Sequence, residues 1–216
     1  MATSYLTLRA PAVAEIEVKR SRFLAEIHPV TDEVAARAVV EAARARHWDA
    51  RHHCSAFILG ARGEVERSSD DGEPSGTAGA PMLEVLRGRE LTDVCAVVTR
   101  WFGGTLLGAG GLVRAYGDAV RAAVAAADVV RRERLAAVEV HLSHAVAAKA
   151  ESELRGRGVQ ILGVEHANEV TLRLGLGVVE FDSVSDLLAG LAHHEIELVP
   201  VGEVWVERHL GGNELA

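Results

Sequence analysis

The chain carries the stretch Ser69-Asp70-Asp71-Gly72-Glu73-Pro74-Ser75-Gly76-Thr77-Ala78-Gly79 and, further along, Arg100-Trp101-Phe102-Gly103-Gly104-Thr105-Leu106-Leu107-Gly108-Ala109-Gly110-Gly111-Leu112-Val113-Arg114. Each stretch leads directly into a segment with a helical pattern. Glycine loses more backbone freedom on folding than other residues, so such a density of glycines indicates turns with positive φ or a close approach to the backbone. The N–H groups at a helix start also attract anions. The two stretches therefore predict a ligand site built from loops at two helix starts.

The segments around these stretches predict a mixed α and β domain, because alternating and continuous apolar runs are interleaved with runs of helical spacing. The predicted strands are a hairpin or a bent strand over 15–30 and single strands over 53–59 and 93–102. The predicted helices are 31–47 with Thr31 as N-cap, 81–86 and 112–127. Residues 61–77 are predicted to form a polar loop, and a loop of that length is usually functional or mobile.

The last third of the chain has the order strand, helix, strand, strand, helix, strand, which is typical of the ferredoxin-like split unit. The run Arg131-Arg132-Glu133-Arg134 is interpreted as a charged linker before it. The sequence thus predicts an α+β protein of two domains. The N-terminal domain with both glycine loops spans 1–136, and the ferredoxin-like domain spans 137–216.

Composition narrows the classes of partner. Residues up to Ala137 include 18 basic and 18 acidic residues, whereas those from Val138 include 5 basic and 13 acidic residues. The acidic C-terminal domain is therefore a poor candidate for binding phosphates by itself. No apolar run reaches the roughly 20 residues of a membrane span, so no membrane partner is predicted. The first residues lack a signal-peptide pattern, and Cys54 and Cys95 are interpreted as buried, reduced thiols, so a cytoplasmic location is expected.

The candidate ligand- or anion-binding residues lie in or beside the two loops. They are Arg51, His53, Asp71, Glu73, Ser75, Gly76, Thr77, Arg100, Gly103, Gly104, Gly110, Gly111 and Arg114. A basic rim is predicted at Lys19, Arg20 and Arg22. The alternative is that the glycines only make tight turns and let helices pack on a sheet. Known nucleotide fingerprints do not match, because no Gly-Lys-Ser/Thr follows the loops and Val113 stands where the third glycine of Gly-x-Gly-x-x-Gly belongs.

Metal chemistry is not predicted from these patterns. Asp70, Asp71 and Glu73 could hold Mg²⁺ together with water and phosphate, but such an acidic string is also typical of a solvated turn. His52 and His53 are adjacent on a predicted strand and point to opposite faces, so both cannot bind one zinc ion. No cofactor and no catalytic residue are predicted. Trp101 and Phe102 either stack on bases or belong to the core.

Taken together, the motifs resemble the YigZ/IMPACT family, in its bacterial two-domain type. The resemblance is carried by Lys19-Arg20-Ser21-Arg22-Phe23, by Asp49-Ala50-Arg51-His52-His53-Cys54 and by both glycine loops through Tyr116. Trp101-Phe102 stands where the family would have a pair of tyrosines or similar residues. The resemblance implies an N-terminal αβ sandwich like the second domain of a small-subunit ribosomal protein and the GHMP kinases. It also implies a C-terminal domain similar to the last domain of elongation factor G.

The resemblance further implies a link to translation, because the eukaryotic relatives restrain a starvation-responsive translation kinase. The leading hypothesis is a non-enzymatic regulatory protein that contacts RNA, a ribosome or a translation factor through its N-terminal glycine loops. One alternative is a Mg²⁺-dependent enzyme acting on a phosphorylated small molecule. Another is a protein-interaction module whose acidic C-terminal domain docks a basic partner.

Overall fold

The computed structural model describes residues 3–209 and contains two five-stranded sheets with helices packed against them. The α+β class is thus confirmed. The described chain divides into two compact units, residues 3–132 together with 208–209 and residues 133–207, and each is described by itself. Within the described residues, no helix is long and apolar enough to cross a membrane.

The N-terminal unit is built on an antiparallel sheet with the strand order β2-β3-β6-β4-β5. Its strands are β2 (Ala12–Val18), β3 (Ser21–Pro29), β4 (His52–Leu59), β5 (Val65–Ser69) and β6 (Val94–Trp101). The central strand β6 is buried along its length from Val94 to Arg100, as its continuous apolar sequence requires.

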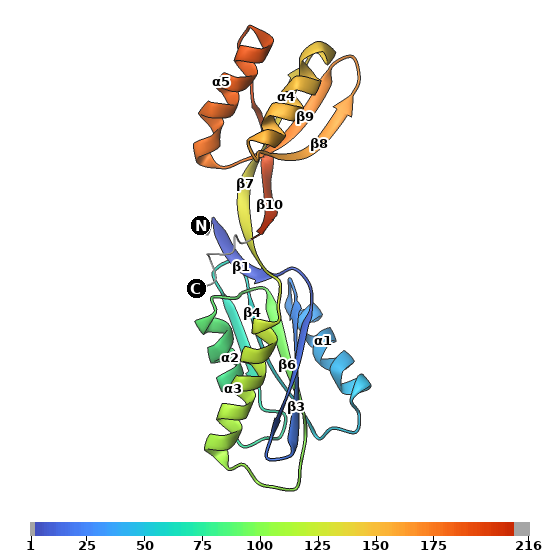
Figure 1. Ribbon diagram of the computed structural model, residues 1–216, viewed down its shortest axis with the longest axis vertical. Helices are drawn as coiled ribbons and strands as arrows, with labels where there is room; N and C mark the ends of the chain where they lie inside the picture. The colour runs from blue at the N-terminus through green and yellow to red at the C-terminus, as the bar shows by residue number, and fades with distance from the viewer. Residues whose placement is uncertain (1–2, 210–216) are drawn as a thin grey trace. The chain divides into compact units, whose positions relative to one another are not determined.

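Helices cover both faces of this sheet (Figure 1). They are α1 (Glu33–Arg46), α2 (Gly79–Gly88) and α3 (Ala109–Ala125). The main core lies between the sheet and the pair α2 and α3, around Phe23, Met82 and Tyr116. A smaller cluster that includes Ala36 and Cys95 packs beneath α1 on the other face. The N-terminal unit therefore has three layers, with one helix, one sheet and two helices.

Local sequence explains some boundaries of these elements, and the structure corrects other boundaries that the sequence predicted. The two-residue turn between β2 and β3 has positive φ at both Lys19 and Arg20, the type I′ geometry whose twist suits a hairpin. The N-cap of α1 is Asp32, whose side chain accepts from the Ala35 N–H at 2.8 Å, and not Thr31. The predicted loop over 61–77 is shorter than expected, because residues 65–69 form the edge strand β5. A polar edge strand lacks the apolar run that marks a central one.

The second unit follows the order β7, α4, β8, β9, α5, β10, and four strands of its sheet have the order β10-β7-β9-β8. The fifth strand of that sheet, formed by residues 4–8, also pairs with β7. Its elements are β7 (Val129–Leu142), α4 (His144–Gly156), β8 (Gln160–His166), β9 (Val170–Leu176), the short 3₁₀ helix η1 (Val178–Glu180), α5 (Phe181–Ala192) and β10 (Val199–His209). The interpretation of residues 131–134 as a linker is wrong, because they lie inside β7. The apolar pattern also missed one strand near the start of the chain, β1 (Ser4–Leu8).

Candidate functional site

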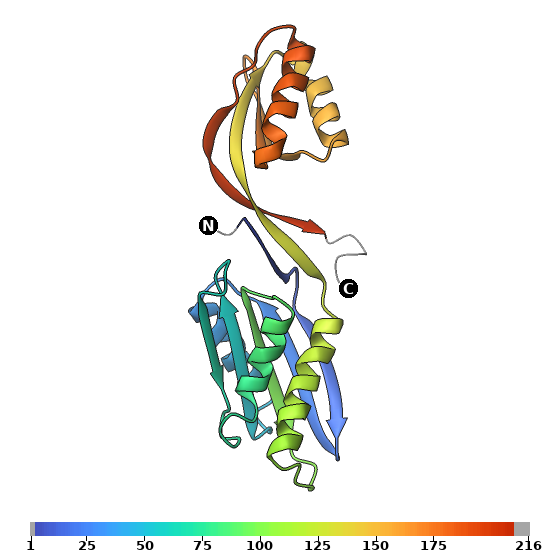
Figure 2. The same cartoon turned by 90° about the vertical axis from the view of Figure 1, so that its left-hand side faces the viewer.

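The loops singled out by the sequence meet at one end of the N-terminal sheet (Figures 1 and 2). Strand register requires this, because Trp101 pairs with Arg22 and Arg100 pairs with His52. The turn between β2 and β3, the segment before β4, the loop 70–78 and the loop 102–108 therefore share that end. It is the lower end of the N-terminal unit in both views.

The first glycine loop is organised by the carboxylate of Asp70. Its Oδ1 accepts from the N–H groups of Ala78 at 3.0 Å and Gly79 at 2.8 Å, and its Oδ2 accepts from Gly76 N–H at 2.8 Å. Burial alone would raise the pKa of Asp70, but these three bonds outweigh it and hold the pKa below its ordinary value. The start of α2 is thus already occupied by the protein's own anion.

The expected anion site at Ser75, Gly76 and Thr77 is therefore not formed at this helix start. Thr77 is buried, and its hydroxyl donates to the Pro74 carbonyl at 2.6 Å. Gly76 has a positive φ of 74°, so it serves the turn, and its N–H is one of the three that Asp70 accepts from. Ser75 stays exposed.

A buried polar network fastens the same loop to the sheet and to α3. Arg100 Nη1 donates to Glu73 Oε1 at 2.6 Å, and the Tyr116 hydroxyl donates to the same oxygen at 2.7 Å. The Cys54 Sγ lies 3.0 Å from the Asp70 carbonyl oxygen and 3.3 Å from the Tyr116 hydroxyl oxygen. Arg100 and Glu73 are both almost fully buried, so Arg100 has no charge to offer to an outside phosphate, contrary to the prediction.

Burial sets the acid–base properties of this network. It raises the pKa of the Cys54 thiol to about 12. The pKa of Tyr116 is also raised, because its hydroxyl is shielded from solvent and lies beside Cys54 and Glu73. A thiol of this kind stays protonated at neutral pH and is a poor nucleophile. Cys54 and Cys95 are free and buried, as expected from the apolar runs that contain them.

The third acid of the loop, Asp71, is also engaged inside the unit. Its Oδ2 accepts from the His53 backbone N–H at 2.7 Å, and its Oδ1 accepts from Arg44 Nη2 at 2.6 Å. The His53 ring nitrogen Nε2 lies 3.1 Å from the His47 carbonyl oxygen, and burial lowers the pKa of this ring. His53 and Asp71 thus hold the loop and α1 together, and the prediction that they face a ligand is not met.

The second glycine loop packs closely on the β2–β3 turn. A Cβ on Gly103 would overlap the Arg20 backbone, so only glycine fits there. The Gly103 N–H donates to Ser21 Oγ at 3.1 Å, and Arg20 Nη2 donates to Thr105 Oγ1 at 3.1 Å. A Cβ on Gly111 would meet Leu107 at 3.0 Å. These two glycines serve packing, which was the alternative to a ligand role.

Gly104 is different, because it has a positive φ of 84° and a Cβ added to it would have no described atom within 4 Å. Among residues 3–209, no side chain caps the start of α3, and the first turn of this helix contains no acidic residue. Large apolar side chains are exposed nearby, with 54% of Phe102 and 83% of Leu106 accessible. This loop presents Phe102, Gly104 and Leu106 to the outside, and no acidic side chain of its own bonds to the helix start.

Aromatic and basic side chains gather beside the second loop. Arg22 lies over the Trp101 ring at 4.0 Å, and the Trp101 indole N–H donates to Asp49 Oδ2 at 2.9 Å. That bond places the segment containing Trp48, which is 83% exposed, next to Trp101. We call this area the loop-end surface. It comprises Lys19, Arg20, Arg22, Trp48, Arg51, Phe102, Gly104 and Leu106.

The charges of Lys19 and Arg51 are open to solvent. Both side chains are exposed, and neither has an ion pair or a side-chain hydrogen bond with any residue that the structure describes. No group of three or more His, Cys, Asp or Glu side chains within residues 3–209 is placed to hold a metal ion. The loop-end surface can therefore offer cations, aromatic faces and backbone N–H groups.

Comparison with known proteins places this geometry in a family. The Impact N-terminal domain model matches residues 19–124, which include both glycine loops. The IMPACT family member YvyE of Bacillus subtilis (strain 168) is 36% identical over 198 residues, covering 92% of this chain and 91% of that protein. The chain belongs to the IMPACT family.

A second IMPACT relative and a solved structure also match most of the chain. The family member YigZ of Escherichia coli (strain K12) is 36% identical over 202 residues, 93% of this chain and 99% of its own length. A crystal structure of a hypothetical protein, 35% identical, aligns over 93% of this chain and 98% of its own with a TM-score of 0.62. The resemblance seen in the motifs is thus confirmed.

The residues of the IMPACT motifs that carry this resemblance lie in two different environments in the fold, one buried and one exposed. Glu73, Cys54, Arg100 and Tyr116 form the buried network, and Phe23 of the basic entry motif belongs to the core. Lys19, Arg20 and Arg22 of that motif, together with Phe102, lie on the loop-end surface. The sequence pattern did not mark Asp70 as the anchor of its loop, or Arg44, Cys54 and Tyr116 as partners of the loop acids. Only the helix start after Asp70, where N–H groups need an acceptor, pointed to its role.

Proposed function

We propose that this IMPACT family protein acts in translation by binding single-stranded RNA, or an unpaired segment of ribosomal RNA, at the loop-end surface. The observation that carries the proposal is the exposure of Trp48 and Phe102 at the same end of the sheet as Lys19 and Arg51, two cations without a partner among the described residues. Bases stack on exposed aromatic side chains, and basic side chains follow the phosphates, in sequence-tolerant RNA binding.

The link to translation comes from the family. It is supported by the expected likeness of the N-terminal unit to a domain of a small-subunit ribosomal protein. The sheet order β10-β7-β9-β8 with helices α4 and α5 supports the ferredoxin-like architecture expected for the second unit, and with it the likeness to the last domain of elongation factor G. Fold likeness is an associational argument, so the site must carry the function.

The loop-end surface changes the set of residues that the sequence proposed for phosphate contact. Lys19, Arg20, Arg22 and Arg51 remain, and Gly104 offers an accessible N–H. Arg100 leaves the set because it neutralises Glu73. The magnesium alternative loses its candidate ligands in the same way, since Asp70, Asp71 and Glu73 accept hydrogen bonds from the protein itself.

Fluorescence anisotropy with a labelled single-stranded RNA of about 20 nucleotides tests the proposal. Binding should weaken with salt, with a log–log slope of roughly −0.7 for each phosphate neutralised. Trp48→Ala should weaken binding by about five- to a hundredfold if one base stacks there. Arg51→Glu and Lys19→Glu should reduce both the affinity and the magnitude of the salt slope.

A matched control is Arg62→Glu, an exposed residue in the turn between β4 and β5 at the opposite end of the same sheet. It should leave the RNA affinity unchanged. Absence of measurable binding at about 50 mM salt, or equal losses in Arg62→Glu and Arg51→Glu, would reject the proposal.

A further inference from the structure

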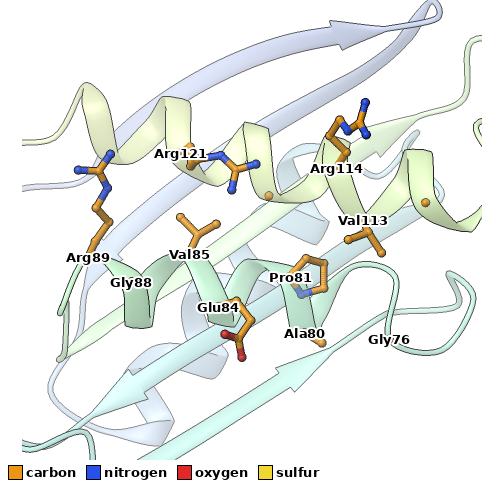
Figure 3. Close-up of a pocket in the computed structure, with 12 residues that line it drawn as sticks. Gly76, Ala80, Pro81, Glu84, Val85, Gly88, Arg89, Val113, Arg114 and Arg121 are labelled. Carbon is orange, nitrogen blue, oxygen red and sulfur yellow. The ribbon is translucent and has the colours of Figure 1, made fainter.

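A groove runs between α2 and α3, on the face of these helices that points away from the sheet (Figure 3). Its volume is about 780 Å³. Pro81 and Val85 from α2 and Val113 from α3 lie between the helices and give the groove an apolar floor. Val113 is 40% exposed. The groove is distinct from the loop-end surface and shares no residue with it.

The rim of the groove is cationic. Arg114 and Arg121 extend from α3, and Arg89 follows the last turn of α2 (Figure 3). Arg121 donates to Asp118 at 2.6 Å, and the one acid among the described lining residues, Glu84, is bonded to Arg87. Arg89 and Arg114 make no ion pair or side-chain hydrogen bond with any described residue. The groove therefore retains positive charge above an apolar floor.

Two glycines in this groove have no close neighbour within the described chain. Gly88 and Gly110 are helical, have no positive φ, and a Cβ on either would have no described atom within 4 Å. The other glycines of these helices do have close neighbours. A Cβ on Gly79 would lie 2.8 Å from Ser69 N, and one on Gly111 would lie 3.0 Å from Leu107 Cβ. A Cβ on Gly117 would meet only the end of the Arg121 side chain, at 3.2 Å. Gly88 is the last residue of α2 and Gly110 the second residue of α3, and both are exposed. Their bare backbone leaves room for close approach by a second molecule.

We propose that this groove docks an amphipathic acidic helix of a partner protein. Helix α2 has 10 residues and so is about 15 Å long, which accommodates roughly ten residues of a docked helix. Apolar side chains at positions i, i+4 and i+7 of that helix would enter between Pro81, Val85 and Val113, and its carboxylates would face Arg89 and Arg114. An RNA backbone fits less well, because the apolar floor would be covered by phosphates without gain.

The test uses the full-length protein, ¹⁵N-labelled, and a pool of helix-stabilised peptides of about 12 residues. Each peptide carries Leu, Phe or Trp at the three anchor positions and Glu on the opposite face. Amide shifts should change at Gly88, Gly110 and Val113. A second pool with Lys in place of Glu should bind about tenfold more weakly or worse.

Four variants make the test specific. Gly88→Ala and Gly110→Ala should each weaken peptide binding by about tenfold while leaving the melting temperature unchanged or higher by about 1–3 °C. Arg89→Glu and Arg114→Glu should weaken it by a similar factor without loss of folding. A variant that gains stability and loses binding cannot have lost binding through unfolding.

Gly190→Ala is the matched control, because Gly190 is also a helical glycine with no described atom within 4 Å of a Cβ, in α5 of the other unit. It should leave peptide affinity unchanged. Unchanged affinity in Gly88→Ala and Gly110→Ala, or absence of shift changes in the groove, would overturn the proposal. So would single-stranded RNA that shifts the groove amides and displaces the peptides. RNA binding at the loop-end surface is measured separately with Trp48→Ala, so either proposal can fail alone.

Discussion

The two glycine loops of the N-terminal unit look alike in sequence and differ in the fold. Both follow a strand and lead into a helix. The first, 70–79, closes on itself because Asp70, Asp71 and Glu73 bond to the helix start, to α1 and to the buried Arg100. The second, 102–111, contains no acidic residue and leaves Phe102, Gly104 and Leu106 exposed. A glycine loop at a helix start is therefore open to an outside ligand only when the sequence does not supply its own anion.

The closed state of the first loop should depend most on Arg100. Arg100→Met removes the cation from Glu73 and leaves a buried carboxylate with one donor fewer, so the unfolding free energy should fall by about 3–5 kcal/mol. Urea unfolding followed by circular dichroism measures this. Arg22→Met, which breaks an exposed pair with Glu15 at 3.4 Å, should cost less than about 1 kcal/mol. Similar losses in the two variants would contradict the buried network.

Substitutions at two adjacent glycines of the second loop should differ in their cost to stability, because Gly103 is closely packed and Gly104 is exposed. Gly103→Ala drives a methyl group into the Arg20 backbone, so the unfolding free energy should fall by about 2–3 kcal/mol or more. Gly104→Ala meets only the strain of positive φ and should cost about 1–2 kcal/mol. Thermal unfolding of both variants checks the difference, and a reversed order would show that the loop is not anchored at Gly103.

Asp70→Ala should open the first loop by removing the acceptor of three N–H bonds. The loss of unfolding free energy should be about 2 kcal/mol, at the upper end for a helix cap, because one carboxylate serves several donors. Asp32→Ala, at the start of α1, removes one such bond and should cost about 1 kcal/mol. An Asp70→Ala loss no larger than that of Asp32→Ala would contradict the organising role of Asp70.

The contribution of Asp70 to the unfolding free energy should also depend on pH, and it should decrease as the pH falls. Its pKa in the folded protein lies below the ordinary value of 3.8, so folding favours the ionised form. The stabilisation is therefore complete above about pH 5 and is lost as the pH falls through the lower, folded pKa. The difference in unfolding free energy between the parent protein and Asp70→Ala should shrink below about pH 4. If this difference grew on acidification, the pKa of Asp70 would be raised by folding and not lowered, which would contradict the prediction.

The smallest effect should come from giving the second loop an anion of its own. Ala109→Glu adds a carboxylate to the first turn of α3, which has none, and should stabilise the unit by about 0.3–1 kcal/mol. It should weaken RNA binding about three- to tenfold, because negative charge would face the phosphates. Ala109→Gln is the neutral control for both measurements. Equal RNA affinity in the two variants would show that the ligand does not approach this loop.

The mixed class, the family and most of the elements could be predicted from the order of residues alone. The apolar run of β6 and the spacing of α3 are local properties that neighbouring residues specify. Prediction failed at β5 and at residues 131–134, since a polar edge strand and a charged segment within a strand look like loops when only local pattern is considered. The glycine motifs also identified the loops where function should be sought.

The role of each residue in those loops emerged only from contacts across the fold. Arg100 and Arg51 look equally available in the sequence, but pairing with Glu73, 27 positions away, removes the charge of Arg100 from the surface. The contact of Cys54 with Tyr116 spans 62 positions, and local spacing does not encode it. Burial and long-range pairing are properties of the assembled sheet and helices. The chemistry of a side chain is therefore set by its residue type, whereas its availability to a ligand is set by what the fold has placed against it.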